Sequence, residues 1–399
     1  MRIERIETVR HEDFPNLLFV LVHGDGLVGL GETFYAAEAV EAYIHSVAAP
    51  LLLGQDASRI TALNRSLEGY VGYSGSGIET RARSAVDIAL WDLAGQRAGL
   101  PLHDLMGGRT RDSIRAYNTC AGTQYVRREG QATQNYGRGL DGRWEDLDRF
   151  LSDAGALAEE LLSEGITGMK IWPFDAYAEM SHGTSITNEQ MRAGLEPIRR
   201  IRETVGDQMD VMIELHGLWT VPAASSIVRA LEPYAPYWVE DPVRADLPGG
   251  LAQLRGVASG IGTMIAAGET VAGLAGYLPL VADKAIDVAT VDTVWCGGLT
   301  HALRIAALAE SYGLAVAPHD CTGPVALTAA THMSVSVPNA LMQETVRASL
   351  RTWYQDFLTD LPPIKDGQIS PPAGAGLGTA LQPDIRTRTG VSTRTSAQD

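Results

Sequence analysis

The chain has 399 residues, of which 45% are hydrophobic and 20% charged, and these ordinary values exclude a disordered, collagen-like or coiled-coil chain. Asp and Glu outnumber Lys and Arg by 48 to 32, which gives a formal net charge of −16, and no basic run offers a surface for nucleic acid or anionic lipid. Three cysteines without a Cys-x-x-Cys pair argue against a disulfide framework or a thiolate zinc site. The charged amino terminus lacks a signal peptide, and no segment approaches the roughly 20 apolar residues of a membrane span, so we expect a cytoplasmic protein.

The first 114 residues predict an α+β domain. Two apolar runs, residues 17–22 and 27–31, flank a His-Gly-Asp-Gly sequence, and an Asp-Gly pair in this position is a strong signal for a β-hairpin. In residues 80–99 the apolar side chains instead recur at helical spacing, and glycine and proline follow as stop signals. We therefore expect strands first and a long helix after them.

Residues 115–345 alternate short apolar runs with amphipathic segments, which is the pattern of successive βα units. We expect eight strands, ending near Gly122, Lys170, His216, Asp241, Thr270, Asp292, Asp320 and Thr345. Eight units in about 230 residues match a (β/α)8 barrel in size and number. A doubly wound sheet is the alternative, but no Gly-x-Gly-x-x-Gly motif follows any of these strands.

The remaining segments read as loops. Residues 346–399 are rich in proline and glycine, and we expect them to pack back on the first region. Residues 386–399 are rich in Thr, Arg and Ser and are expected to be frayed or exposed. Two insertions, residues 123–142 after the first barrel strand and 173–187 after the second, are candidates for shaping an active site.

Three glutamates end three successive predicted strands. Glu214, Glu240 and Glu269 are separated by 26 and 29 residues, close to the roughly 30 residues of one βαβ unit. Because the carboxyl ends of barrel strands meet at one face, the carboxylates should lie side by side, which is unfavourable unless a cation neutralises them. An all-oxygen ligand set favours Mg²⁺ over Zn²⁺, so we expect one Mg²⁺ ion per subunit.

Other predicted strand ends carry acid/base groups. Lys170 ends the second strand, and His216 follows Glu214 by two residues, so the latter two side chains point the same way. Asp292 and His319 lie one unit apart, and a carboxylate bonded to one imidazole nitrogen raises the basicity of the other. We interpret this pair as an acid/base dyad, although His319 alone is equally compatible with a histidine that only satisfies a strand end.

A metal cluster beside two imidazoles and an ammonium group suits the removal of a proton next to a carboxylate. The resulting enediolate bears two negative charges, which Mg²⁺ and Lys170 can stabilise. His216 and His319 would then take and give protons.

Several segments form a recognisable set when they are taken together. They are RARSAVDIALWDLAGQRAGLPLHDLMGG at residues 81–108, VEDP around Glu240, AGE at Glu269, DTVWCGG from Asp292, APHD around His319, and PPAGAGLG near the end. With this set, nearly the whole chain resembles the enolase superfamily, and within it the mandelate racemase and muconate lactonizing enzyme group that includes many acid-sugar dehydratases.

The resemblance implies an α/β fold in which a modified TIM barrel, (β/α)7β-like, carries an α+β capping domain formed from both ends of the chain. The cap would comprise residues 1–114, the barrel residues 115–345, and residues 346–399 would pack back on the cap. The resemblance also implies Mg²⁺ on the three strand-end glutamates, the dyad role described above, and a hydrogen bond between Glu344 and the substrate carboxylate.

The second strand departs from the pattern of this group. A Lys-x-Lys pair is usual there, whereas this chain has Lys170-Ile171-Trp172, so an indole that cannot accept a proton replaces the usual second base. Lys170 matches the first lysine, for which an electrostatic or orienting role is implied. The third strand has the sequence ELHG. It is similar to that of acid-sugar dehydratases with a histidine two residues after the first metal ligand, which makes His216 the candidate base. Whether His216 or Lys170 opposes His319 stays open. Trp172 either packs in the barrel or contacts substrate.

The cap is expected to supply specificity. Residues 11–16, with His11 and Phe14, would contact substrate, and the Gly/Ser-rich residues 72–77, with Tyr73, would act as a lid. The resemblance also suggests a homo-oligomer.

These features predict a Mg²⁺-dependent dehydratase that converts an acid sugar, an aldonate or an aldarate, into a 2-keto-3-deoxy acid. One alternative is a racemase, epimerase or cycloisomerase that acts on a hydroxy acid or sugar lactone with the same site. The other is a non-catalytic sugar-acid binding protein. In each case the expected partner is a small carboxylate sugar, and not nucleic acid or a membrane.

Overall fold

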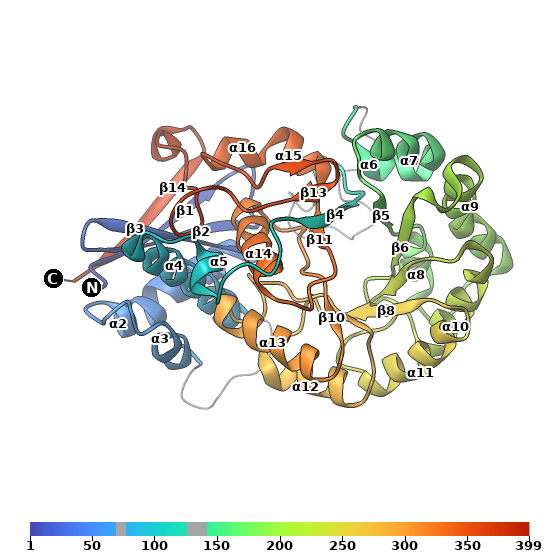
Figure 1. Ribbon diagram of the computed structural model, residues 1–399, viewed down its shortest axis with the longest axis horizontal. Helices are drawn as coiled ribbons and strands as arrows, with labels where there is room; N and C mark the ends of the chain where they lie inside the picture. The colour runs from blue at the N-terminus through green and yellow to red at the C-terminus, as the bar shows by residue number, and fades with distance from the viewer. Residues whose placement is uncertain (69–76, 126–141, 399) are drawn as a thin grey trace.

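The computed structural model describes residues 1–68, 77–125 and 142–398. Figure 1 shows a smaller sheet unit, which contains both ends of the chain, beside a larger ring of strands and helices. The smaller unit is a four-stranded antiparallel sheet in the order β14 (Val391–Ala397), β1 (Arg5–His11), β2 (Leu17–Gly24) and β3 (Leu27–Phe34). Helix α4 (Ile78–Ala98) packs across β3 and β2.

The two elements predicted in the first region are confirmed. Asp25 and Gly26 join β2 to β3 with φ angles of 51° and 76°, and positive φ at both residues is what a type I′ hairpin turn requires. Helix α4 ends at Gly99, which adopts the left-handed conformation with a φ of 67°.

Two glycines of β3 allow α4 to lie very close to the sheet. A Cβ atom at Gly31 would overlap the carbonyl oxygen of Ala85, and one at Gly29 would overlap that of Ala89. Both oxygens belong to the backbone of α4 and cannot move aside. The close approach of helix and strand therefore requires glycine at these two positions.

The larger unit is a barrel whose described residues form eight parallel strands. The strands are β4 (Ile114–Thr119), β5 (Gly168–Ile171), β6 (Asp210–Glu214), β7 (Trp238–Glu240), β8 (Met264–Ala267), β9 (Val288–Ala289), β10 (Ala315–Val316) and β11 (Gln343–Thr345). Strands β4 to β10 pair in chain order, and β11 pairs with β4. A parallel bridge between Val316 and Ala340 closes the remaining gap. The barrel interpretation is confirmed over the doubly wound sheet.

The remaining helices cover the two units. In the cap they are α1 (Ala37–Tyr43), α2 (Ala49–Leu52), α3 (Ile60–Ser66) and α5 (Leu102–Leu105). Around the barrel they are α6 (Asp146–Ser152), α7 (Ala154–Ser163), α8 (Asp175–Ser181), α9 (Asn188–Val205), α10 (Val221–Ala230), α11 (Pro248–Ser259), α12 (Gly273–Ala282), α13 (Leu299–Ser311) and α14 (Pro324–Ser336). No helix in these described ranges combines the length and apolar character needed to cross a membrane.

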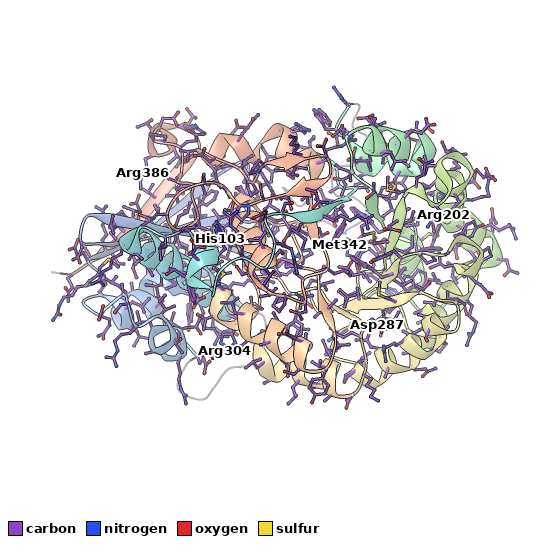
Figure 2. All side chains as sticks on the ribbon, viewed as in Figure 1. His103, Arg202, Asp287, Arg304, Met342 and Arg386 are labelled. Atoms are coloured by element: carbon purple, nitrogen blue, oxygen red, sulfur yellow. The ribbon has the colours of Figure 1, made fainter. Side chains whose placement is uncertain are left out.

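The carboxyl-terminal segment contacts both units. It forms α15 (Arg347–Thr352), α16 (Tyr354–Phe357), β12 (Ile364–Lys365) and β13 (Gln368–Ile369) before β14. Strand β13 pairs antiparallel with barrel strand β4, and the N–H of Leu377 donates to Asp92 of α4 over 2.7 Å. Figure 2 shows Arg386 on the cap side of the molecule, whereas Arg202 and Asp287 lie on the barrel side.

The expectation that residues 386–399 are frayed is wrong for most of that segment, because it contains strand β14. This strand pairs with β1 along its whole length, from Val391 opposite His11 to Ala397 opposite Arg5. Its Thr and Ser side chains are largely exposed, as the composition predicts. Threonine nevertheless favours strands, and the free edge of β1 supplies the hydrogen-bond partners.

Candidate active site

The candidate site lies above an apolar layer inside the barrel. This layer consists of Tyr117, Met212, Trp238, Ala266, Val288, Ala317 and Met342. Alternate residues of a strand face the same way, so the residues two positions further on point into the mouth of the barrel. Six of these carry polar groups: Thr119, Glu214, Glu240, Thr290, His319 and Glu344.

The three strand-end glutamates meet, as their spacing predicts. Carboxylate oxygens of Glu214, Glu240 and Glu269 lie within 4.8 Å of one another. The ammonium Nζ of Lys170 lies 2.9 Å from Glu240, 2.9 Å from Glu344 and 3.3 Å from Glu214. Burial would lower the pKa of Lys170, but these carboxylates raise it well above its usual value. Lys170 therefore lies as a cation among three carboxylates, and whether it or His216 opposes His319 stays a prediction.

This donor set fits a hard divalent cation. Atom Oε2 of Glu214 is buried and accepts no hydrogen bond from a described residue, although the Lys170 ammonium lies 3.3 Å from it. Burial raises the pKa of Glu240 to about 7 against the opposing charge of Lys170, and burial followed by the charges of Glu269 and Glu214 raises the pKa of Asp241 well above its usual value. Crowded carboxylates are costly in a protein interior unless a cation offsets them, and carboxylate oxygens are the ligands that Mg²⁺ prefers.

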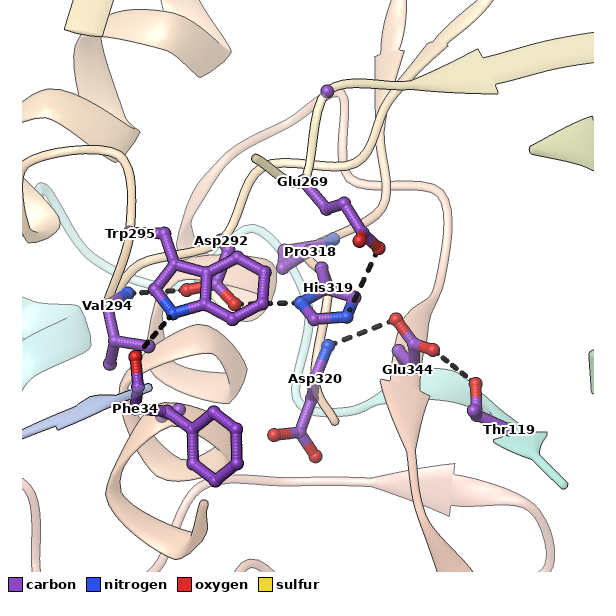
Figure 3. Close-up of polar contacts among 12 residues, drawn as sticks. Phe34, Thr119, Glu269, Asp292, Val294, Trp295, Pro318, His319, Asp320 and Glu344 are labelled. Carbon is purple, nitrogen blue, oxygen red and sulfur yellow. Dashed lines mark hydrogen bonds and ion pairs between the residues drawn. The ribbon is translucent and has the colours of Figure 1, made fainter. Parts of the chain in front are cut away.

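Figure 3 shows that Asp292 and His319 form the predicted dyad. His319 Nδ1 lies 2.7 Å from Asp292 Oδ2, and His319 Nε2 lies 3.3 Å from Glu269 Oε2. Asp292 is held in turn by the N–H of Val294 at 2.6 Å. Burial would lower the pKa of His319, but Glu269, Glu344 and Asp292 raise it well above its usual value.

Trp295 connects this dyad to the cap. Its ring stacks on the His319 imidazole, with the ring centres 5.2 Å apart and an interplanar angle of 30°. The guanidinium of Arg81, from α4, lies 4.6 Å from the centre of the indole. Trp295 Nε1 and Arg81 Nη1 both donate to the carbonyl oxygen of Phe34 at the end of β3, over 3.2 and 2.6 Å. Cap residues thus hold the indole against the imidazole.

A second histidine–aspartate pair lies at the same cavity, and its carboxylate was not predicted. His216 Nδ1 lies 2.7 Å from Oδ2 of Asp175, which is fully buried at the start of α8. Burial would lower the pKa of His216, but Asp175 and Glu214 raise it to about 10. The insertion after β5 was expected to shape the site, but nothing in the sequence singles out Asp175 within it.

Glu344 is surrounded by donors. Thr119 donates a hydrogen bond to Oε1, and the N–H of Asp320 donates to Oε2 over 3.0 Å (Figure 3). Burial would raise the pKa of Glu344, but Lys170 and His319 lower it. The predicted hydrogen bond between Glu344 and a substrate carboxylate stays a prediction.

A cavity of about 150 Å³ lies between these groups. Its described lining is Phe34, Thr119, Tyr125, Lys170, Trp172, His216, Glu269, Trp295, His319, Cys321 and Glu344. Trp172 packs against Phe150 and His216, with ring centres 5.4 and 5.7 Å away. It also lines the cavity, and its contact with substrate stays a prediction. The lining residues that were not predicted from the sequence are Phe34, Thr119, Tyr125, Trp295 and Cys321.

The predicted cap residues lie elsewhere. His11 and Phe14 contact one another and Phe357 of α16, with ring centres between 5.0 and 6.0 Å apart, and neither lines the cavity. The described geometry does not support their predicted contact with substrate, because the turn after β1 packs into this aromatic cluster. Tyr73 and most of the expected lid lie outside the described residues. Among the described cap residues, Phe34 lines the cavity.

Family models match both parts of this architecture. Residues 6–107 match the mandelate racemase / muconate lactonizing enzyme N-terminal domain, and residues 153–385 match the enolase C-terminal domain-like family. The chain belongs to the mandelate racemase/muconate lactonizing enzyme family of the enolase superfamily. The resemblance inferred from the sequence motifs is confirmed.

Curated relatives and solved structures agree with this membership. A D-galactonate dehydratase of Pectobacterium atrosepticum is 30% identical over 393 residues, which cover 96% of this chain and 93% of the relative. A D-gluconate dehydratase of Thermoproteus tenax is 28% identical over 380 residues, or 92% of this chain and 68% of the relative. A crystal structure of a mandelate racemase subgroup enolase from Agrobacterium tumefaciens, with a succinimide residue, sodium and phosphate, superimposes with a TM-score of 0.88 at 44% identity and covers 100% of this chain and 99% of its own.

Proposed function

We propose that the protein is a Mg²⁺-dependent acid-sugar dehydratase, which removes the proton α to the carboxylate of an aldonate or aldarate and eliminates the β-hydroxyl. The observation that carries the proposal is one cavity lined by His216, His319, Lys170 and Glu269. Each histidine is paired with a buried aspartate, and Glu269 belongs to the three-glutamate cluster. The names of the relatives, D-galactonate and D-gluconate dehydratase, support the same reaction class.

Glu214, Glu240 and Glu269 would hold the Mg²⁺ ion. When bound, such an ion supplies Lewis-acid stabilisation of negative charge on a substrate carboxylate. Lys170 would add a fixed positive charge from the side of Glu344, where its Nζ lies 2.9 Å from the carboxylate. Because the Lys170 ammonium is paired with three carboxylates, its proposed role is electrostatic.

His216 would take the α-proton. Its Nδ1 is engaged by Asp175, which leaves Nε2 as the nitrogen available to the cavity that the imidazole lines. The Asp175 carboxylate fixes this tautomer and stabilises the imidazolium that forms when the proton arrives.

His319 would donate a proton to the departing hydroxyl. Asp292 engages its Nδ1 in the same way, and stacking on Trp295 holds the ring plane. Loss of the hydroxyl as water gives an enol, which tautomerises to the 2-keto-3-deoxy acid.

Two imidazoles that line one cavity also suit a 1,1-proton transfer, so epimerisation is the second candidate. The test is incubation of the purified protein with Mg²⁺ and a panel of aldonates and aldarates in D₂O. A dehydratase should give 2-keto products that react with semicarbazide. Exchange of deuterium at Cα without loss of the hydroxyl would establish epimerisation instead.

A non-catalytic sugar-acid binding protein would bind a member of the panel without exchange or product. The His319→Asn variant distinguishes a binding protein from an enzyme. An enzyme should lose turnover with this substitution while its metal binding is unchanged. A cytoplasmic location and a homo-oligomeric state remain part of the proposal, the latter to be measured by light scattering.

A further inference from the structure

A second and larger cavity borders the glutamate cluster. It encloses about 760 Å³ and shares His216 and Glu269 with the smaller cavity. Its wall also contains Asp241, the residue that follows Glu240 at the end of β7. The site proposed above uses no part of Asp241.

The backbone of Asp241 is fixed on two sides. Its N–H donates to the carbonyl of Ala266 over 2.9 Å, and its own carbonyl accepts from the N–H of Gly217 over 2.7 Å. Its φ is 36°, in the left-handed region that non-glycine residues seldom adopt. A strained backbone conformation of this kind persists only where the surrounding structure holds it in place. Here the hydrogen bonds with Ala266 and Gly217 hold the backbone that carries the Asp241 side chain.

One oxygen of the Asp241 carboxylate lacks a partner among the residues that the structure describes. The residue is only 5% exposed, and no hydrogen bond from a described residue reaches its Oδ1, which is buried. Unpartnered buried carboxylates are rare because desolvation is costly, and here three more carboxylates lie nearby. A ligand with donor or positive character is the partner that the arrangement calls for.

We infer that Asp241 is an outer carboxylate of the metal centre and accepts a hydrogen bond from a water bound to the metal on the side of the larger cavity. The inference rests on the Mg²⁺ site of the proposed function. Direct ligation is not what the geometry offers, since within the described ranges the oxygens that lie mutually within 4.8 Å belong to the three glutamates. Mg²⁺ keeps several waters in protein sites, and groups that hydrogen-bond its ligands tune its affinity.

The test is a calorimetric titration of the purified full chain with Mg²⁺, and with Mn²⁺ as a second probe. Asp241→Asn should weaken metal binding by about 10- to 100-fold, and Glu240→Gln, which removes a direct ligand, should weaken it further. Asparagine tolerates the left-handed conformation, so the backbone is kept. The matched control is Asp246→Asn on the same cavity wall, where the exposed carboxylate pairs with Arg244, and its affinity should equal the wild type.

Thermal melting provides a second measurement. Without metal, Asp241→Asn should melt at or above the wild-type temperature because one repelling carboxylate is gone, and saturating Mg²⁺ should raise its Tm less than it raises the wild type. Should the asparagine variant not fold, Asp241→Ser takes its place in both measurements.

Equal metal affinity in the wild type and Asp241→Asn would overturn the inference, and so would a metal-free variant that melts lower while binding Mg²⁺ normally, since the residue would then be structural. If the wild type binds no Mg²⁺, both this inference and the proposed metal site are wrong. If Asp241→Asn binds Mg²⁺ more weakly but the wild type dehydrates no acid sugar, the inference about Asp241 stands and only the proposed dehydratase activity is wrong.

Discussion

At the residue scale, the distinctive feature of the site is that each histidine has its own buried carboxylate. Asp175→Asn should lower kcat on the acid-sugar substrate by at least about 100-fold, because general acid/base catalysis is worth about 10² to 10⁴ and the amide cannot stabilise a charged imidazole. KM should change little. Steady-state kinetics with the substrate found in the panel measures both constants.

The control for this variant is Glu189→Gln, which alters an exposed acid in the first turn of the neighbouring helix α9 and should leave kcat unchanged. If Asp175→Asn turns over at the wild-type rate, His216 does not act as the base in the proposed way.

Trp295 gives a second prediction at this scale. Trp295→Leu removes the ring that stacks on His319 and should lower kcat by roughly 10- to 100-fold, since small misplacements of a catalytic group can cost about that much. Trp295→Phe keeps an aromatic face and should recover most of the loss. Trp353→Leu, which disturbs the aromatic cluster around Phe14 away from the cavity, is the control. Equal losses in the Leu and Phe variants would contradict a role for stacking.

Residues on strand ends were predictable, and residues supplied by other parts of the fold were not. Glu214, Glu240 and Glu269 carry their own positional signal, because βα periodicity sets where each strand ends. Asp175 and Trp295 sit in connections, and their partners are set by how separate segments meet. No local pattern in one sequence encodes such contacts.

At the element scale, the contact between β3 and α4 depends on two glycines. Gly31→Ala should lower the free energy of unfolding by about 2 kcal/mol or more, because the new Cβ overlaps a helix carbonyl and one element must shift. Gly256→Ala in α11 is the matched control, since its Cβ meets open space and alanine favours a helix interior by about 0.5–1 kcal/mol. Urea unfolding measures both, and a neutral Gly31→Ala would show that the contact can relax.

The same scale shows which elements a sequence can reveal. The β2–β3 hairpin and α4 carry strong local signals, an Asp-Gly turn and helical periodicity, and both were predicted. Strand β14 carries a weak signal, because its exposed Thr and Ser residues show no alternation of apolar side chains. It exists because β1 offers an open edge, which is a tertiary condition.

At the scale of the whole molecule, the carboxyl-terminal segment ties the two units together. Strand β13 extends the barrel at β4, while β14 completes the cap sheet beside β1. The cap in turn holds Trp295 against His319 through Phe34 and Arg81. Stability of the cap and geometry of the site are therefore linked.

An ion pair at the junction of the first strand and the carboxyl-terminal segment makes this stability depend on pH. Glu7 of β1 accepts from Arg386 at 2.6 and 3.1 Å, and His23 lies 3.2 Å away. Burial would raise the pKa of Glu7, but the hydrogen bonds with His23 and Arg386 lower it from 4.5 to about 2. A lowered carboxyl pKa contributes stability that is fully present above about pH 4.5 and is lost as the pH falls toward 2.

Glu7→Gln should therefore unfold more easily than the wild type at pH 7, by about 1–2 kcal/mol, and the difference should shrink as the pH falls from 4.5 toward 3. This value lies below the full effect of the pKa shift because the Arg386 side chain is 43% exposed and water screens the pair. Urea unfolding at intervals between pH 7 and pH 3 measures the difference, with Glu4→Gln at an exposed position near the start of β1 as the control. A difference that stays constant over this range would mean that Glu7 stabilises the cap by packing, because only the ionised carboxylate gains from Arg386.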